Sequence, residues 1–500
     1  MTVELRAELR RFVQDPAAGG TTFGMALQAL VDADPDAPAV TCGEETLTRA
    51  ELFARSYDLG LQLAAAGVRP GGYVTTVLHN SCDTVVAMFA TWFVGAVPQV
   101  LSPRLPAREL REILELTAPA AVLGEVDGDL TGRATVMAPP FALGPATDGI
   151  LPDVAAPAWK APTSGGSTGR PKVIVAGQPA VVEAITLGDV FRIPTSGAAL
   201  VTAPLSHNAP FCAAALAVVR GCHLVLMPRF DAAETVRLIE RHAVRWVYAV
   251  PTMMARIWKL PPEVRDGTDV SSVEVWLHMA AACAPALKEA FLGWLGPGAV
   301  WELYGGTEAQ SVTLLDGHEW LTHRGSVGRP VSGEMQVRDD AGTVLPPGAV
   351  GRIWLRREAG APETYRYLGA VPVSDESGWE TLGDLGHVDE EGYVYLADRD
   401  TDMFTVGGVN VYPAEIEAVL VEHDLVVDAC VVGLPDEELG AVPHAIVLAD
   451  GQVPDLDLWL AHRLAPHKRP KSIEYVAAPL RDDAGKVRRA QLRNERTEQR

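Results

Sequence analysis

The chain has 500 residues, of which 48% are hydrophobic and 21% are charged, and its formal net charge is −22. This length exceeds what one compact core supports, so we expect two or three domains in a globular rather than a disordered protein. The acidic charge argues against nucleic-acid binding, because phosphate backbones attract basic surfaces.

Helical periodicity alternates with short apolar runs between about residue 50 and residue 305. Residues 48–67 predict a helix that a glycine ends, residues 73–80 a strand, and residues 82–94 a second helix. Strand-like runs follow at residues 223–228, 245–250 and 273–279, with helical stretches between them. This alternation predicts a largely parallel sheet flanked by helices.

The pattern changes after Gly325. Residues 333–357 hold short strands divided by Asp-Gly-type turns, which predicts a small antiparallel β-barrel or sheet. Beyond a further hairpin, residues 413–424 predict a helix that begins at a proline, and a strand follows it. We therefore expect an α/β protein with a large N-terminal domain over residues 1–399 and a small α+β C-terminal domain over residues 400–500.

Cysteine usage and the N-terminus bear on location. The six cysteines are scattered without a C-x-x-C pair, which fits a reducing compartment and gives no zinc or disulfide framework. The N-terminus lacks an apolar signal core, and no uncharged apolar run is long enough to cross a membrane. A cytoplasmic protein without a membrane span is expected.

The segment TSGGSTGRPK, residues 163–172, is rich in glycine and hydroxyl side chains and ends in a lysine. It is not a nucleotide P-loop, because Pro171 precedes the lysine and Val173 follows it. Residues 165–169 match the G-x-S-x-G of a hydrolase elbow, but an elbow feeds into a helix, whereas Pro171 and the β-branched run after it favour a strand. An exposed linker explains the glycines but not the terminal lysine.

The remaining interpretation is a strand–loop–strand that folds over the phosphates of ATP. Backbone N–H groups and the hydroxyls of Ser167 and Thr168 would donate to phosphate oxygens, and Lys172 would add positive charge. The segment resembles the signature of the adenylate-forming superfamily, which includes acyl-CoA synthetases, non-ribosomal adenylation domains and luciferases. Further motifs in the same order extend this resemblance over residues 163–489, and the whole is most similar to bacterial acyl-CoA ligases.

The stretch Tyr304-Gly305-Gly306-Thr307-Glu308 is similar to the family's Y-G-x-T-E motif. The resemblance assigns Thr307 to the α-phosphate and Glu308 to a magnesium ion, which suits the preference of magnesium for carboxylate oxygens. Residues 281–285 stand where the family stacks adenine on the backbone, with alanines in place of the usual paired glycines.

Three C-terminal motifs complete the resemblance. Asp384, in TLGDLG, and Arg399 would bind the ribose hydroxyls, for which an acceptor-only carboxylate is well suited. The glycines at 407 and 408 resemble the loop that borders the pantetheine tunnel. Lys486, in a G-K-x-x-R element, resembles the catalytic lysine, and Thr401 stands at the hinge of a mobile C-terminal domain, where the family usually has aspartate or lysine.

The residues that the resemblance implies fall into three groups. The catalytic residues are Lys486, Thr307, Glu308 and His207. The nucleotide and coenzyme A contacts are Thr163, Ser164, Gly165, Gly166, Ser167, Thr168, Gly169, Lys172, Ala281, Ala282, Cys283, Gly305, Asp384, Arg399, Gly407 and Gly408. The acid pocket would include Asn208, Phe211, Thr252, Ala280, Gly306 and Ser311.

The implied reaction activates a carboxylic acid with ATP and Mg²⁺ to an acyl-adenylate, releases pyrophosphate, and transfers the acyl group to coenzyme A. Small side chains near His207 indicate room for a bulky cyclic or aryl acid. The alternative is a stand-alone adenylation enzyme that loads a carrier protein. A nucleotide-binding relic without activity is disfavoured, because Lys486, Glu308 and Asp384 are all present.

Overall fold

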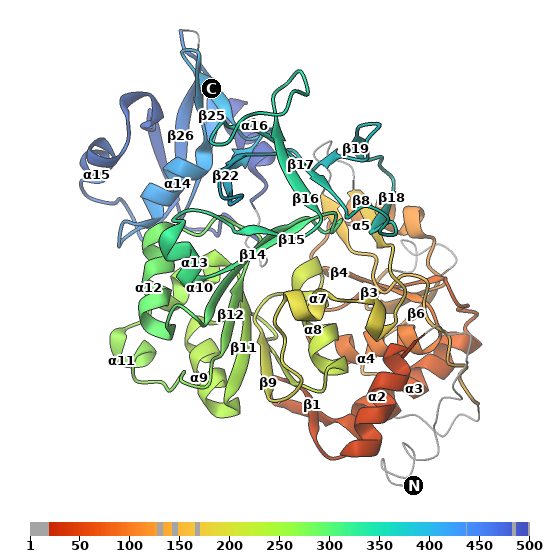
Figure 1. Ribbon diagram of the computed structural model, residues 1–500. Coiled ribbons are helices and arrows are strands. Elements are labelled where there is room, and N and C mark those ends of the chain that lie inside the picture. Colours follow the sequence, from red (N-terminus) through yellow and green to blue (C-terminus); the bar gives the residue numbers. More distant parts are fainter. Residues whose placement is uncertain are drawn as a thin grey trace.

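The computed structural model describes residues 20–127, 134–142, 149–165, 171–436, 438–482 and 487–498. The expected α/β class is confirmed: helices and largely parallel sheets fill the N-terminal part, and a smaller α+β unit follows (Figure 1). No helix within these ranges is both long and apolar enough to cross a bilayer.

The largest sheet has nine strands in the order β15-β14-β13-β12-β11-β9-β10-β1-β2. The six strands from β13 to β1 run parallel to their neighbours, and antiparallel strands close both edges. The bounds are β1 Pro38–Cys42, β2 Glu45–Thr48, β9 Ala198–Val201, β10 His223–Leu226, β11 Val244–Ala249, β12 Val275–His278, β13 Val300–Gly305, β14 Val312–Asp316 and β15 Arg329–Ser332.

Helices of the N-terminal part pack on these sheets. They are α2 Phe23–Ala33, α3 Arg49–Ala65, α4 Cys82–Phe93, α5 Ala107–Thr117, α7 Leu187–Val190, α8 Asn208–Val219, α9 Ala232–His242, α10 Pro251–Trp258, α11 Pro262–Arg265, α12 Pro285–Leu295 and α13 Gly317–Thr322. Local sequence sets their starts: α3 begins with a capping box in which Thr48 and Glu51 each accept from the other's backbone N–H, and α10 and α12 begin at prolines.

A second, four-stranded parallel sheet has the order β4-β3-β5-β6. Its strands are β3 Tyr73–Val77, β4 Val97–Leu101, β5 Ala121–Gly124 and β6 Thr135–Met137. A three-stranded sheet, β18-β8-β7, joins β7 Thr163–Gly165, β8 Pro171–Ala176 and β18 Tyr365–Leu368. Since β7 and β8 pair antiparallel, with Gly165 opposite Pro171, the strand–loop–strand is confirmed at both flanks and the hydrolase elbow is excluded.

The later part of the chain builds two more sheets. An antiparallel six-stranded sheet contains β16 Glu334–Arg338, β17 Gly351–Arg356, β19 Val373–Ser374, β20 Glu380–Thr381, β21 Asp384–Val388 and β22 Val394–Arg399. The C-terminal sheet contains β23 Phe404–Val406, β24 Val409–Val411, β25 Asp428–Asp436, β26 Gly440–Leu448 and β27 Ser472–Val476, with helices α14 Pro413–Val421, α15 Leu456–Arg463 and α16 Arg489–Thr497. The division at 399/400 stays a prediction; it falls where β22 ends and the chain enters the C-terminal sheet.

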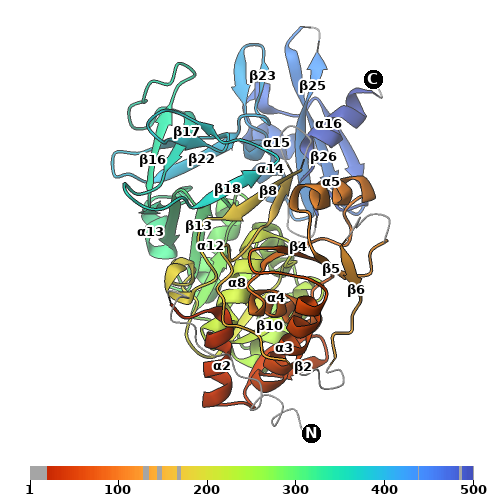
Figure 2. The same cartoon turned by 90° about the vertical axis from the view of Figure 1, so that its right-hand side faces the viewer.

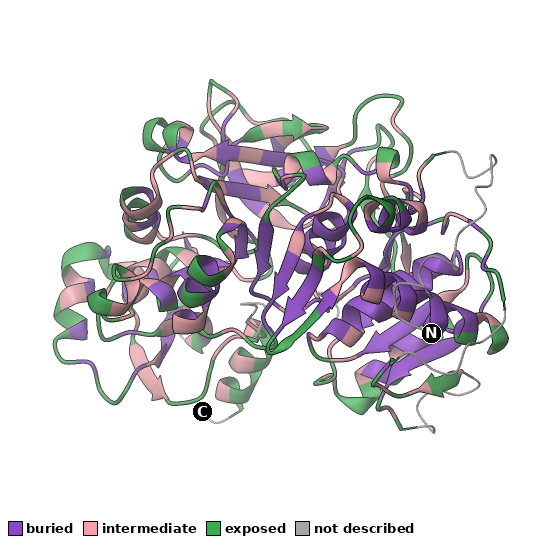
Figure 3. Ribbon diagram, turned by 90° about the horizontal axis from the view of Figure 1, so that it is seen from below, coloured by how far each residue is buried: buried purple, intermediate pink, exposed green. Residues whose placement is uncertain are grey.

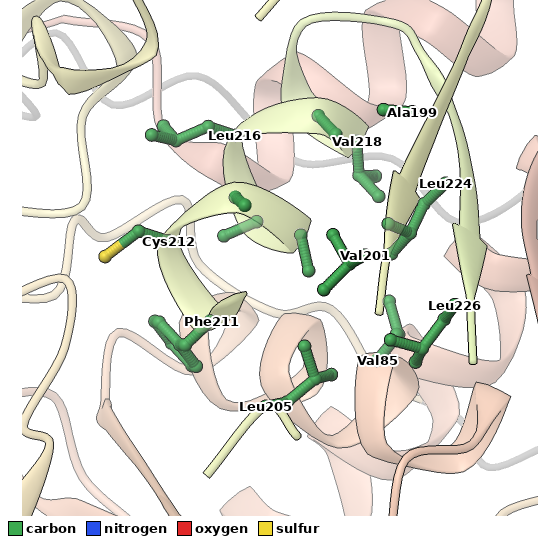
Figure 4. Packing of buried hydrophobic residues seen from close by; sticks show 14 of the residues in the cluster. Val85, Ala199, Val201, Leu205, Phe211, Cys212, Leu216, Val218, Leu224 and Leu226 are labelled. Atoms are coloured by element: carbon green, nitrogen blue, oxygen red, sulfur yellow. The ribbon is translucent and has the colours of Figure 1, made fainter. Parts of the chain in front are cut away.

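The main core lies between the nine-stranded sheet and the helices beside it, and buried residues concentrate along those strands (Figure 3). Helix α8 is apolar almost all round and packs between β9, β10 and α4 (Figure 4). Its Phe211 is 4% exposed and lies against Trp92 and Trp159, with ring centroids 5.9 and 6.2 Å away. This packing fixes the N-terminal end of α8, where His207 and Asn208 lie.

The C-terminal unit lies above the N-terminal part (Figures 1 and 2). Arg488 Nη2 lies 3.5 Å from Glu109 Oε2 of α5, and Lys259 of the N-terminal part donates to the carbonyl of Val426. The chain just after Lys486 therefore faces the N-terminal part of the molecule.

Candidate active site

Asp384 begins β21 and lies directly opposite Arg399 of β22. Its Oδ1 is 3.3 Å from Arg399 Nε, and its Oδ2 accepts a hydrogen bond of 2.8 Å from the hydroxyl of Tyr304. Burial and then the Asp384 charge raise the pKa of Tyr304 well above its usual value, so Tyr304 remains a donor. The two expected ribose contacts thus lie together, and Tyr304 orients the carboxylate.

Glu308 and Lys172 meet at the glycine-loop hairpin. Lys172 Nζ lies 3.1 Å from Glu308 Oε1, and the hydroxyl of Tyr367 donates to the same oxygen at 2.5 Å. Lys172 also donates to Tyr367 at 2.9 Å and lies 4.1 Å from the centre of its ring. Glu308 is 4% exposed, and these contacts hold its carboxylate beside the start of β8.

A polar wall continues from Tyr367 along the same face of β18. The hydroxyl of Tyr365 donates to Glu380 at 2.6 Å, and Gln310 donates to the same carboxylate oxygen at 2.6 Å. Burial, followed by the neighbouring carboxylates, raises the pKa of both Tyr365 and Tyr367. Sequence reasoning missed these tyrosines; their alternation in TYRYL indicates a shared face, but not which strand they cover.

The loop between β13 and β14 is built tightly around Gly306. A Cβ added there would lie 2.3 Å from Leu382 Cδ1 and 2.9 Å from Glu308 Oε2, so a larger residue would displace these two side chains. Thr307 is half-buried beside it, and Gly305 ends β13. Ser311 is fully buried and donates to the carbonyl of Ser332 at 2.7 Å, which leaves its hydroxyl committed to the backbone.

The adenine segment follows β12. Ala280 is exposed with φ of 75°, in the left-handed region that glycine adopts easily; Ala281 and Cys283 are half-buried and Ala282 is exposed.

Beneath the adenine segment, Lys288 of α12 is fully buried between His278 Nε2 at 2.6 Å and Glu302 Oε2 at 3.0 Å. Burial and then Lys288 lower the pKa of His278. This cluster, missed in the sequence, ties α12 to the end of β12 and the middle of β13 and so supports the segment.

Three residues expected at the acid site, His207, Asn208 and Phe211, lie at the start of α8. His207 is its N-cap, and His207, Asn208 and Thr252 are half-buried. A cavity of about 10 Å³ lies beside His207 and is lined by residues that include Lys160, Leu205 and Phe211. Asn208 Oδ1 accepts a hydrogen bond of 2.5 Å from Lys160, a residue that sequence reasoning did not consider.

The remaining candidates divide by whether the structure describes them. Thr163 and Ser164 are half-buried on β7, Thr401 is exposed, and Gly407 and Gly408 form the exposed turn between β23 and β24 with φ of 55° and 83°. Five candidates lie outside the described residues: Gly166, Ser167, Thr168, Gly169 and Lys486.

Comparison with known proteins adds family evidence. Residues 27–365 match the family model described as "AMP-binding enzyme", and residues 415–486 match its C-terminal domain. The 2-succinylbenzoate–CoA ligase of Bacillus thuringiensis subsp. konkukian (strain 97-27) is 27% identical, over 92% of this chain and 95% of that protein. The fatty acid–[acyl-carrier-protein] ligase ScoC of Streptomyces coeruleorubidus is 31% identical, over 92% of this chain and 94% of that protein.

A solved structure has the same fold. The O-succinylbenzoate coenzyme A synthetase of Bacillus subtilis, in complex with ATP and magnesium ion, aligns with a TM-score of 0.80 and 27% identity. The alignment covers 93% of this chain and 98% of that one.

Proposed function

The chain belongs to the AMP-binding enzyme family, and on this premise we propose that it ligates a carboxylic acid to coenzyme A in two steps. A carboxylate oxygen of the acid attacks the α-phosphorus of ATP, and the bond to pyrophosphate breaks. The sulfur of coenzyme A then attacks the acyl carbon of the acyl-adenylate, AMP leaves with the bonding electrons, and the thiol proton passes to solvent. The enzyme is an AMP-forming acyl-CoA ligase.

One observation carries the proposal: the short loop from Tyr304 to Glu308 is held at both ends by groups suited to a nucleotide. Tyr304 is bonded to Asp384, an acceptor for a ribose diol, and Glu308 is bonded to Lys172, a cation beside the glycine-loop hairpin. A ribose acceptor and a phosphate-binding cation thus lie one short loop apart. In this arrangement Asp384 and Arg399 hold the ribose, while Thr307 and Lys172 donate to phosphate oxygens.

Glu308 fits a magnesium ion. Its Oε1 accepts from Lys172 and Tyr367, whereas its Oε2 has no hydrogen-bond partner among the described residues. Magnesium prefers such carboxylate oxygens and supplies charge neutralisation at phosphate when it is bound. The protein's own part is to hold Glu308 buried and restrained at the hairpin.

The acid is proposed to be a cyclic or aryl acid and the acceptor to be coenzyme A. The succinylbenzoate relatives are named for an aryl acid and coenzyme A, whereas ScoC is named for a fatty acid and a carrier protein. The half-buried His207 and Asn208 at the start of α8 offer a polar rim to a pocket otherwise backed by apolar side chains. The cavity there now holds only about 10 Å³, so on this proposal a ring enters by displacing the side chains that fill the space.

The C-terminal domain is proposed to alternate between the two steps. Arg488 contacts Glu109, so the chain from residue 487 onward faces the N-terminal part at this point, while the turn at Gly407 and Gly408 is exposed. The proposal assigns this orientation to adenylation and gives Lys486 the role of stabilising charge at the phosphates. Rotation about the backbone near Thr401 brings the glycine turn to the acid site for thioester formation.

The test is pyrophosphate exchange with a panel of carboxylic acids, followed by product analysis with coenzyme A or a phosphopantetheinyl carrier protein as acceptor. Exchange that depends on an aryl or cyclic acid, and an acyl-CoA product, are expected. Absence of exchange with every acid class overturns the ligase assignment. A product that forms only on the carrier protein shows that the carrier, and not coenzyme A, is the acceptor.

A further inference from the structure

Lys160 is a buried cation that has no carboxylate partner among the described residues. Its residue is 5% exposed, and it interrupts the apolar segment AWKAP that leads into β7. Its partners among the described residues are Asn208 Oδ1 at 2.5 Å, the Cys212 thiol and the ring of Trp159, whose centroid is 5.1 Å away. None of these carries a negative charge, and burying an ammonium group without one is costly.

The hydrogen bonds of Lys160 determine which way the Asn208 amide faces. An ammonium group only donates, so the amide must present its oxygen to Lys160. The Cys212 thiol donates to the same Oδ1 at 3.5 Å, which adds a second donor on the inner side. Asn208 Nδ2 therefore lies away from both donors, has no acceptor among the described residues, and belongs to a residue that is half-buried.

Two further features mark this location: the electropositive start of α8 and a small cavity next to it. Asn208 is the first residue of α8, a helix of 12 residues whose first turn has no acidic residue and no side-chain cap. The backbone N–H groups there add a partial positive charge. The adjoining cavity of about 10 Å³, lined by Lys160 and His207, accommodates one water-sized atom.

We propose that Lys160 is a specificity-determining residue: it fixes Asn208 as a donor to an oxygen substituent of the acid other than the carboxylate that reacts. The substrate class is an aryl or cyclic acid with a second acceptor oxygen, and an anionic oxygen such as a phenolate or a second carboxylate is favoured. Lys160 acts by positioning Asn208 and through its charge. This inference rests on the proposed ligase function.

The experiment measures kcat/KM for pyrophosphate exchange with pairs of benzoates that differ only by a hydroxyl or a methyl group at ring position 2, 3 or 4, with phthalate as a dianionic acid. The wild type is expected to prefer the oxygen-bearing member at one ring position. Lys160→Met should reduce that preference about tenfold, the effect of losing one hydrogen bond to a charged group. Lys160→Arg, which keeps a donor-only cation, should restore part of it.

Asn208→Asp replaces the proposed hydrogen-bond donor at this position with an acceptor. Its carboxylate pairs with Lys160 and presents an acceptor, so the variant should shift preference from hydroxy- to amino-substituted benzoates. This variant and Asn208→Ala also test the proposal if Lys160→Met does not fold.

The outcomes separate the two proposals. No acid-dependent exchange by the wild type refutes the ligase function itself. Exchange by the wild type, with equal losses for all acids in Lys160→Met and Asn208→Ala, assigns Lys160 to the reacting carboxylate or to the fold and overturns the specificity role. An unchanged preference in both variants overturns it as well.

Discussion

The ammonium group of Lys172 lies 3.1 Å from the carboxylate of Glu308, although 136 residues separate them in the chain. The contact joins the glycine-loop hairpin to the loop after β13, and the side chains are 22% and 6% exposed. A cation proposed for phosphate and a carboxylate proposed for magnesium thus restrain each other before either meets its ligand.

Lys172→Ala should weaken ATP binding without weakening the magnesium site. Loss of the cation removes a charge-assisted contact to phosphate, so the KM for ATP should rise about tenfold. Without Lys172, no lysine competes with magnesium for the Glu308 carboxylate, so the magnesium concentration for half-maximal exchange should not rise. Titrating ATP and magnesium separately in the exchange assay checks both statements; Tyr367→Phe, which keeps the charge, is the control and should show a smaller rise in KM.

Asp384→Ala should raise the KM for ATP at least about tenfold with little change in the turnover at saturation, because the ribose contact is the same in ground and transition states. Tyr304→Phe removes one donor to the carboxylate and should have a milder effect in the same direction. Calorimetry of nucleotide binding is the independent measurement. Unchanged affinity in Asp384→Ala would remove this residue from the ribose site.

Ala280→Gly should stabilise the protein. Ala280 has φ of 75°, a conformation that costs an L-residue with a Cβ about 1 kcal/mol relative to glycine. Ala281 is not among the residues with positive φ, so Ala281→Gly is the matched control and should lower stability by roughly 0.5 kcal/mol through chain entropy. Thermal unfolding of both variants is the measurement. Equal shifts of the melting temperature in the same direction would contradict backbone strain at Ala280.

His223→Gln should flatten the dependence of stability on pH between about 6.5 and about 4. Burial, with His242 nearby, lowers the pKa of His223 from 6.5 to about 4, and its Nε2 lies 2.7 Å from Thr41 Oγ1. As pH falls, His223 is protonated in the unfolded chain at a higher pH than in the folded protein. The contribution of neutral His223 to the free energy of unfolding is therefore fully present above the unfolded pKa and is lost as pH falls, by at most about 3 kcal/mol. Denaturation of the wild type and the variant at several pH values is the measurement, with the exposed His318→Gln as control.

Thr401→Pro and Lys486→Ala should separate the two half-reactions. Proline fixes φ near −65° and restricts the residue before it, so Thr401→Pro should keep the adenylating orientation, with near-normal pyrophosphate exchange and thioester formation reduced by orders of magnitude. A normal thioester rate in Thr401→Pro places the hinge elsewhere.

Lys486→Ala should nearly abolish pyrophosphate exchange but spare thioester formation from supplied acyl-adenylate.

Local sequence signals predicted much of the architecture. Pro171 and the β-branched run after it distinguished strand β8 from a helix, and the alternation of helices and apolar runs predicted the parallel sheets. These features depend on neighbouring residues, so the sequence carries them directly.

Contacts between residues far apart in the chain were harder to predict from the sequence. Tyr367 reaches Lys172 only because β18 pairs with β8, 195 residues away in the chain, and no local pattern specifies that pairing. Lys160 and Lys288 each interrupt an apolar run, which was the available signal, but a lone lysine in such a run is ordinarily read as exposed.

The contact between Arg488 and Glu109 has a consequence for the protein's response to salt. The side chains are 62% and 26% exposed, and an exposed ion pair contributes about 1 kcal/mol or less, which added salt screens further. A contact this weak is what the proposed departure of the C-terminal domain in every turnover requires. The balance between accumulated acyl-adenylate and released thioester should therefore shift toward thioester as ionic strength rises, and Glu109→Gln should produce the same shift at low salt.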